Sequence, residues 1–187
     1  MADRPNVLIV DDERDLADLY AAWLADDYAV ETAYDGETAI ERVDESVDVV
    51  LLDRRMPGMS GDEVLQKVRA EFPECAIAMI TAVDPDFDIL EMGFDAYITK
   101  PVEESQLGDV IDRLLRRSEY TETLREFFMR LSQREALLAE LPKSELESDE
   151  RFQSLEAEIQ ELRAESESHM EELSGDDFEA LFYRLDA

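Results

Sequence analysis

The chain has 187 residues and carries 49 acidic against 18 basic side chains, which gives a formal net charge of -31. Such an acidic surface repels the phosphate backbone of nucleic acids, so we expect no direct binding to DNA or RNA. Hydrophobic residues still make up 45% of the chain, which is enough for a folded core and argues against wholesale disorder.

Roughly the first 118 residues alternate between apolar runs and helical patterns. The expected strands are residues 6–10, 28–34, 47–53, 76–80 and 96–98, and the expected helices begin near Leu16, Thr38, Ser60 and Val102. Continuous apolar runs bounded by turns are typical of strands buried on both faces of a parallel sheet. Five strands that alternate with helices predict an α/β fold with a doubly wound parallel sheet.

Polar side chains stand where these strands end. Asp11 and Asp12 follow the first strand, Asp53 the third, Thr81 the fourth and Lys100 the fifth. The carboxyl ends of parallel strands share one edge, so three carboxylates, a hydroxyl and an ammonium should converge. Oxygen ligands without a Cys/His cluster favour Mg²⁺. One carboxylate could then form an aspartyl-phosphate, with Lys100 and Thr81 on the phosphoryl oxygens.

Four motifs at these strand ends resemble the receiver domain of two-component response regulators. They are Val7-Leu8-Ile9-Val10-Asp11-Asp12-Glu13, Leu52-Asp53 with Met56-Pro57-Gly58-Met59-Ser60-Gly61, Ile80-Thr81-Ala82, and Gly93-Phe94-Asp95-Ala96-Tyr97-Ile98-Thr99-Lys100-Pro101. The resemblance covers residues 5–118 and implies a flavodoxin-like (βα)5 sheet with the strand order 2-1-3-4-5. We therefore expect a receiver domain over residues 1–118.

The resemblance also implies a role for each residue around the third strand. Asp53 would accept a phosphoryl group from a sensor histidine kinase or a phosphotransfer protein. Asp12, Asp53 and the backbone carbonyl oxygen of Arg55 would bind Mg²⁺, with Asp11 assisting through a water molecule. The Arg55 side chain would tune access to the phosphoryl group. The chemistry would be limited to Mg-dependent autophosphorylation and slow dephosphorylation, so the chain is not expected to be an enzyme.

A conformational switch is the next implication of the resemblance. Lys100 would hold the phosphoryl group, and a cis peptide bond is expected before Pro101. On phosphorylation the Thr81 hydroxyl would move toward the phosphoryl group and Tyr97 would turn inward, which changes the output face. Residues 83–93 leave only about two helical turns for the fourth helix, so we expect that face to be altered.

Each of these residues also has an ordinary structural interpretation. In a chain with 49 acids, Asp11 and Asp12 could be surface charge, Thr81 a strand-end hydroxyl, Tyr97 a core side chain and Lys100 a solvated cation. Their joint placement at one sheet edge favours signalling. Two other functions stay open: a phosphate-independent, receiver-like scaffold with a helical interaction arm, and a phosphohydrolase.

From residue 119 onward the pattern is wholly helical. A first apolar face consists of Tyr120, Leu124, Phe127, Phe128, Leu131, Leu138 and Leu141, and Pro142 ends that run. A second helix is expected from Lys143 onward, with an apolar seam of Phe152, Leu155, Ile159 and Leu162. Residues 178–185 form a short amphipathic pattern. We expect two long antiparallel helices covered by this short third helix.

This extension resembles HalX, a small domain attached to receivers in salt-adapted archaea. The resemblance rests on Tyr120-Thr121-Glu122-Thr123-Leu124 and Asp177-Phe178-Glu179-Ala180-Leu181-Phe182. We expect a HalX-like domain over residues 119–187, which acts by self-association or through a partner helix. Its 20 acidic and 7 basic residues include no basic recognition helix for DNA. A histidine on a helical seam, such as His169, is more often packed than a phosphorelay site.

Several sequence features indicate where in the cell the chain is expected to reside. Cys75 is the only cysteine, which excludes an intrachain disulfide. No apolar run could span a bilayer, and Met1-Ala2-Asp3-Arg4-Pro5 does not read as a signal peptide, so we expect a cytoplasmic chain with no membrane contact. The acidic surface, with only three lysines, resembles proteins adapted to very high salt, where ions screen self-repulsion.

Overall fold

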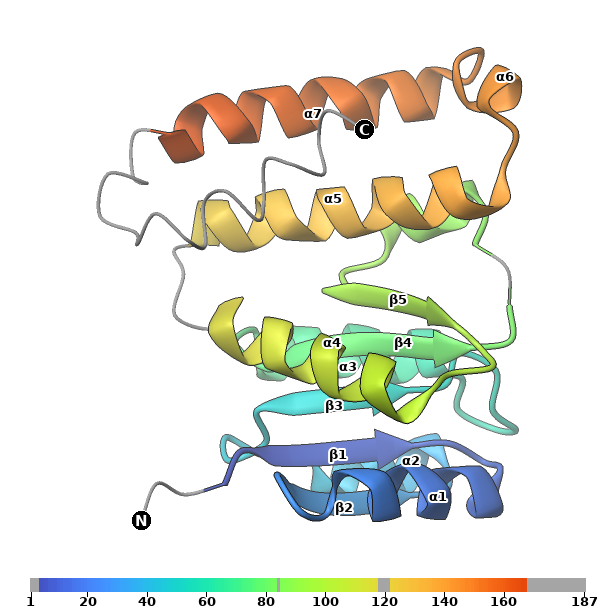
Figure 1. The fold of residues 1–187 in the computed structure, drawn as a ribbon, viewed down its shortest axis with the longest axis vertical. Helices are drawn as coiled ribbons and strands as arrows, with labels where there is room; N and C mark the ends of the chain where they lie inside the picture. Colours follow the sequence, from blue (N-terminus) through green and yellow to red (C-terminus); the bar gives the residue numbers. More distant parts are fainter. Residues whose placement is uncertain (1–3, 84, 118–121, 168–187) are drawn as a thin grey trace.

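The computed structural model describes residues 4–83, 85–117 and 122–167 and contains a five-stranded parallel sheet (Figure 1). Its strands are β1 (Asn6–Val10), β2 (Ala29–Ala33), β3 (Val49–Leu52), β4 (Ala76–Thr81) and β5 (Ala96–Thr99). They lie in the order β2-β1-β3-β4-β5, and every neighbouring pair is parallel. The predicted doubly wound α/β fold and its strand order are confirmed.

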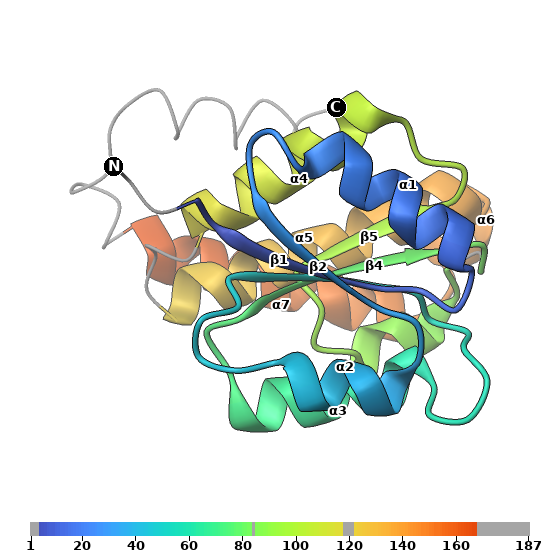
Figure 2. The same cartoon turned by 90° about the horizontal axis from the view of Figure 1, so that it is seen from below.

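Helices cover both faces of the sheet (Figure 2). Crossovers between parallel strands are right-handed, and the direction across the sheet reverses at β2, so the crossovers before and after β2 place their helices on opposite faces. One face carries α1 (Arg14–Leu24) and α4 (Glu104–Arg117), and the other carries α2 (Gly36–Arg42) and α3 (Gly61–Glu71). Successive strand residues alternate between two apolar clusters. Val7 and Ile9 belong to the cluster under α1 and α4, whereas Leu8 and Val10 belong to the cluster under α2 and α3. Burial on both sides explains the continuous apolar runs.

Between β4 and β5 the chain forms only a short 3-10 helix, η1 (Phe87–Glu91). The Asp86 carboxylate accepts a hydrogen bond from the backbone N of Phe87 at 2.6 Å and starts this element. The side chains of Phe87 and Ile89 are buried in the core. The expected shortening of the fourth helix is therefore present, and the segment is a single 3-10 helix.

The extension forms a helical hairpin beside β5 (Figure 1). α5 (Glu122–Glu140) contacts β5 and η1, and α7 (Glu150–Glu167) runs antiparallel to α5 on its outer side. Phe127 and Phe128 of α5 share one apolar cluster with Phe87, Ile89 and Phe94. The apolar stripe of the hairpin thus packs against the sheet domain as well as against α7, and the two parts have a continuous core.

The second long helix begins later than its sequence pattern predicts. A short helix, α6 (Lys143–Leu146), ends after one turn, and α7 starts only at Glu150. Asp149 precedes α7, and its Oδ1 accepts a hydrogen bond from the backbone N of Arg151 at 2.8 Å. An aspartate in this position caps a new helix, which separates α7 from α6. The predicted third helix at 178–185, His169 and the predicted boundary at 118–119 lie outside the described residues.

Shortening a buried side chain of α5 should destabilise the sheet domain together with the hairpin. Phe128 is 2% exposed, so Phe128→Ala is expected to lower the free energy of unfolding by about 3–5 kcal/mol. The only tryptophan, Trp23, lies in α1, and its fluorescence should show the same loss as the helical circular dichroism. Leu138→Ala, at a side chain 41% exposed, is the control and should cost less than about 1 kcal/mol. An unchanged Trp23 transition would contradict the shared core.

Candidate functional site

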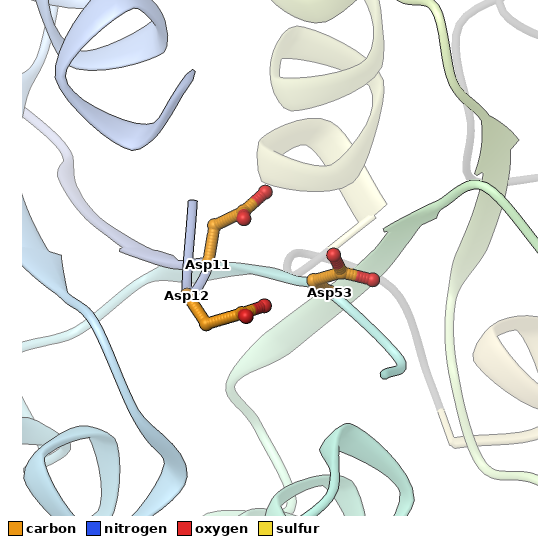
Figure 3. Close-up of side chains that lie close together, drawn as sticks. All are labelled: Asp11, Asp12 and Asp53. Carbon is orange, nitrogen blue, oxygen red and sulfur yellow. The ribbon is translucent and has the colours of Figure 1, made fainter. Parts of the chain in front are cut away.

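Three carboxylates meet at the carboxyl edge of the sheet (Figure 3). Asp53 extends β3, and its backbone N donates to the carbonyl oxygen of Val10 at 2.8 Å. Asp11 extends β1 in the same way, through a 3.1 Å hydrogen bond to Ala33 O. The side chains of Asp11, Asp12 and Asp53 point toward one another, and one oxygen of each lies within 4.8 Å of the others. Strand register thus brings together residues 42 positions apart in the chain.

Lys100 supplies the positive charge of the site. Its Nζ lies 2.7 Å from Asp11 Oδ2 and 2.8 Å from Asp53 Oδ2. The backbone N of Lys100 donates to Thr81 O at 2.8 Å, which continues the β4–β5 pairing by one residue. The Lys100–Pro101 peptide bond is cis. The ammonium therefore bridges two carboxylates that are both buried.

The charges of Asp11, Asp53 and Lys100 act strongly on one another because these three side chains are largely shielded from water. Burial is the main reason that the pKa of Asp11 is raised, although the hydrogen bond from Lys100 works in the opposite direction. Burial also opposes the charge of Lys100, but the hydrogen bonds to Asp11 and Asp53 outweigh it and raise the pKa of Lys100. The lysine is thus held in its charged form while negative charge at Asp11 is disfavoured.

The loop after Asp53 is folded back tightly onto the site. The backbone N of Arg55 donates to Asp53 Oδ1 at 3.2 Å, while the Arg55 side chain is exposed. Gly58 has a φ of 77°, a conformation that favours glycine. A Cβ atom on Gly61 would stand only 2.0 Å from Asp53 O, so only glycine allows α3 to start this close. These constraints place the Arg55 peptide beside the Asp53 carboxylate.

Thr81 and Tyr97 lie on neighbouring strands next to this edge. Thr81 ends β4, is buried, and its Oγ1 accepts a hydrogen bond from Val83 N at 3.3 Å. The hydroxyl group of Tyr97 donates to Val83 O at 2.8 Å, and its ring stands 5.4 Å from that of Phe94. Both side chains therefore hold the same peptide segment, the one that leads from β4 toward η1.

One residue near the site was not predicted from the sequence. Arg54 is only 12% exposed, and its guanidinium forms ion pairs with Asp62 of α3 and Asp88 of η1. It also lies near the Tyr97 hydroxyl, where it counteracts the burial that raises the pKa of Tyr97. Of the two adjacent arginines, only Arg55 was expected to act at the site. No spacing rule distinguishes Asp62 and Asp88 from the other acids of this chain, so no sequence signal marked Arg54.

The donor set fits a hard divalent cation. Asp11, Asp12 and Asp53 offer carboxylate oxygens, and the Arg55 carbonyl belongs to the peptide folded back on Asp53. Among the described residues, the acidic, histidine or cysteine side chains whose ligand atoms lie close enough together to hold one ion are Asp11, Asp12 and Asp53. Oxygen donors alone suit Mg²⁺ better than zinc.

A five-stranded parallel sheet with an acidic site and a lysine at its carboxyl edge defines a receiver-type signalling domain. Residues 7–112 match the family model described as the response regulator receiver domain, and residues 116–182 match the HalX domain. The chain belongs to the response regulator receiver family and carries a HalX domain after the receiver. Both resemblances predicted from the sequence are confirmed.

Known relatives agree with this assignment. A "Putative transcriptional regulator" of Haloferax volcanii is 48% identical over 163 residues, which are 87% of this chain but only 28% of that protein. The structure of a CheY-like response regulator receiver domain protein from Methanospirillum hungatei has a TM-score of 0.59 and 29% identity, and it covers 62% of this chain and 97% of its own. TrrA from Thermotoga maritima, in complex with Mg²⁺ and beryllofluoride, has a TM-score of 0.53 and 30% identity, with 59% and 99% coverage.

Removing the Asp11 charge should stabilise the fold. The pKa of Asp11 is raised on folding, so its ionisation opposes folding once the pH rises through the folded-state pKa. Asp11→Asn is therefore expected to raise the free energy of unfolding at pH 7. The gain should vanish at pH values below the ordinary aspartate pKa of 3.8. Denaturant titrations across this range measure it.

Asp109→Asn, at an exposed position of α4, is the matched control and should change stability by less than about 0.5 kcal/mol. A less stable Asp11→Asn variant at pH 7 would show that the pairing of Asp11 with Lys100 outweighs its burial.

Proposed function

We propose that this chain is a response regulator in which Asp53 accepts a phosphoryl group from a histidine kinase or a phosphotransfer protein, in a Mg-dependent reaction. The observation that carries the proposal is the Lys100 ammonium, held between Asp53 and Asp11 at 2.8 and 2.7 Å. Receiver domains in general interact with such kinases and phosphotransfer proteins. Because Lys100 Nζ already contacts the Asp53 carboxylate, it could also bind a phosphoryl group attached to Asp53.

Each residue of the site has its own role in the proposed phosphoryl transfer. An Asp53 carboxylate oxygen attacks the phosphorus atom, an O–P bond forms, and the N–P bond of the donor phosphohistidine breaks as its imidazole leaves with the electron pair. Lys100 exchanges the Asp53 oxygen for a phosphoryl oxygen and keeps its charge there. The Thr81 hydroxyl donates to another phosphoryl oxygen. Asp12, Asp53, the Arg55 carbonyl and Asp11 would hold Mg²⁺, which when bound neutralises the charge on the transferring group.

The chemistry of the chain itself is proposed to stop at this switch. Autophosphorylation from small donors and slow hydrolysis of the aspartyl-phosphate are the only reactions assigned to it, so we do not regard it as an enzyme that turns over a substrate. Among the described residues no helix is long and apolar enough to cross a bilayer. Output is assigned to protein contacts of the HalX hairpin, because residues 119–187 hold 20 acidic against 7 basic side chains and are a poor match for DNA.

The name and length of the relative in Haloferax volcanii bear on the output. That protein is described as a putative transcriptional regulator, and the present chain spans 28% of its length. We propose that the receiver and hairpin together form a control module and that its output reaches transcription through other protein segments. The alternative is a phosphate-independent scaffold, which the continuous core between receiver and hairpin would also suit.

Phosphorylation by acetyl phosphate tests the proposal directly. In molar salt with Mg²⁺, the native chain should gain one phosphoryl group by mass, and Asp53→Asn should gain none. Lys100→Met should slow incorporation by about 100-fold, because it removes the charge that holds the phosphoryl oxygens. A chelator that removes Mg²⁺ should abolish the reaction in every variant.

Asp44→Asn, an exposed acid in the loop that precedes β3, is the control and should react like the native chain. Hydrodynamic size, recorded on the same samples, reports whether phosphorylation changes assembly. A folded native chain that neither gains mass nor binds Mg²⁺ would overturn the switch and favour the scaffold.

A further inference from the structure

The short helix η1 is held by residues that belong to both domains. On its receiver side stands Arg54, the residue directly after the phosphoacceptor Asp53. On its outer side stands α5 of the hairpin, which also contacts β5. Like β5, η1 thus touches both the surroundings of Asp53 and the HalX domain.

The receiver-side contact is ionic and partly shielded from solvent. The Arg54 guanidinium pairs with Asp88 of η1 and, at 3.1 Å, with Asp62 of α3. The arginine side chain is 12% exposed, so salt in bulk solvent screens these pairs only partly. A phosphoryl group on Asp53, the residue before Arg54 in the chain, would replace the single negative charge of the carboxylate with about two. The balance between Asp62 and Asp88 as its partners would then shift.

The hairpin-side contact is a set of hydrogen bonds from one buried amide. Gln133 of α5 is fully buried, and its Nε2 donates to Ile89 O at 3.0 Å and to Met92 O at 2.9 Å. Leu90 O accepts a further hydrogen bond from Arg130 Nη1 at 3.2 Å. Carbonyl groups at the end of η1, and that of Met92 directly after it, thus accept hydrogen bonds from α5. Buried carbonyls cost stability if these partners move away, so η1 and α5 must move together.

A contact from α7 completes the outer side. The guanidinium carbon of Arg151 lies 4.2 Å from the centre of the Phe87 ring, at the first residue of η1. Both long helices of the hairpin therefore contact this five-residue segment. A shift of η1 cannot be absorbed by α5 alone.

We propose that the clamp formed by Arg54 and Gln133 on η1 carries the phosphorylation state of Asp53 to the HalX hairpin. This inference rests on the proposed function, since it takes phosphorylation of Asp53 as its input. Arg54 acts here as a positioning residue, because it reaches the hairpin only through Asp88. The route runs beside the Thr81 and Tyr97 pair and ends within the same chain, without a second copy.

Hydrogen exchange of the full chain tests the clamp, with beryllofluoride and Mg²⁺ as the probe of the phosphorylated state. Allosteric coupling typically changes an equilibrium by about 5- to 150-fold, so amide exchange in α5 and α7 of the native chain should change at least fivefold. Gln133→Met removes the amide at similar volume, and Asp88→Ala removes the ionic contact at a side chain 52% exposed. Each should reduce the response of the hairpin to less than about twofold.

Glu156→Ala is the matched control. It removes an equally simple ion pair, Arg134 Nε to Glu156 Oε1 at 2.6 Å, which lies within the hairpin and does not involve η1. This variant should respond like the native chain. Every variant should still show slower exchange at the ends of β1 and β3 when the probe binds, and Asp53→Asn should not.

The outcomes separate the two proposals. Native-like hairpin responses in both Gln133→Met and Asp88→Ala would overturn the clamp while leaving the switch intact. So would binding of the probe at the strand ends without any response in the hairpin. No response of the native chain at either place would overturn the proposed function and the clamp with it.

Discussion

The ion pairs of Lys100 with Asp11 and Asp53 are the interaction on which the functional site depends. Two buried carboxylates at one sheet edge repel each other, and leaving them unpaired would cost several kcal/mol. The lysine relieves that repulsion because the β4–β5 pairing continues to its own backbone N. The order of the strands and the continued β4–β5 pairing together bring this cation to these anions.

Much of this arrangement was predictable from the sequence. Four of the strands, β1, β3, β4 and β5, are apolar runs that end in or lead into a polar residue, so topology alone places Asp11, Asp53, Thr81 and Lys100 at one edge. The contacts of Arg54 and Gln133 were not predictable. Their partners are two acids among 49 and a set of backbone carbonyls, and neither leaves a periodic signal. The start of α7 was missed because the cap at Asp149 is a local hydrogen bond within an otherwise continuous helical pattern.

The HalX hairpin contributes to the hydrophobic core of the receiver. In the sequence the extension looks like a second unit joined after the receiver, with an apolar stripe to be buried internally. In the structure that stripe completes the receiver's own core around Phe87, Ile89 and Phe94. A shortened segment between β4 and β5 leaves those side chains without a full helix to cover them, and α5 provides the missing cover. The short η1 and the added hairpin therefore together cover this part of the receiver core.

The position of α5 has a further consequence for the ends of the sheet. A terminal strand exposes a row of unpaired backbone groups on which another chain can add a strand and aggregate. At β2 this is countered by charge, since Glu31 stands exposed on that strand and pairs with Arg42. At β5 the hairpin lies alongside instead, and Ser132 Oγ donates to Asp95 O at 2.8 Å just before the strand begins. The HalX hairpin thus also protects the receiver against strand exchange between copies.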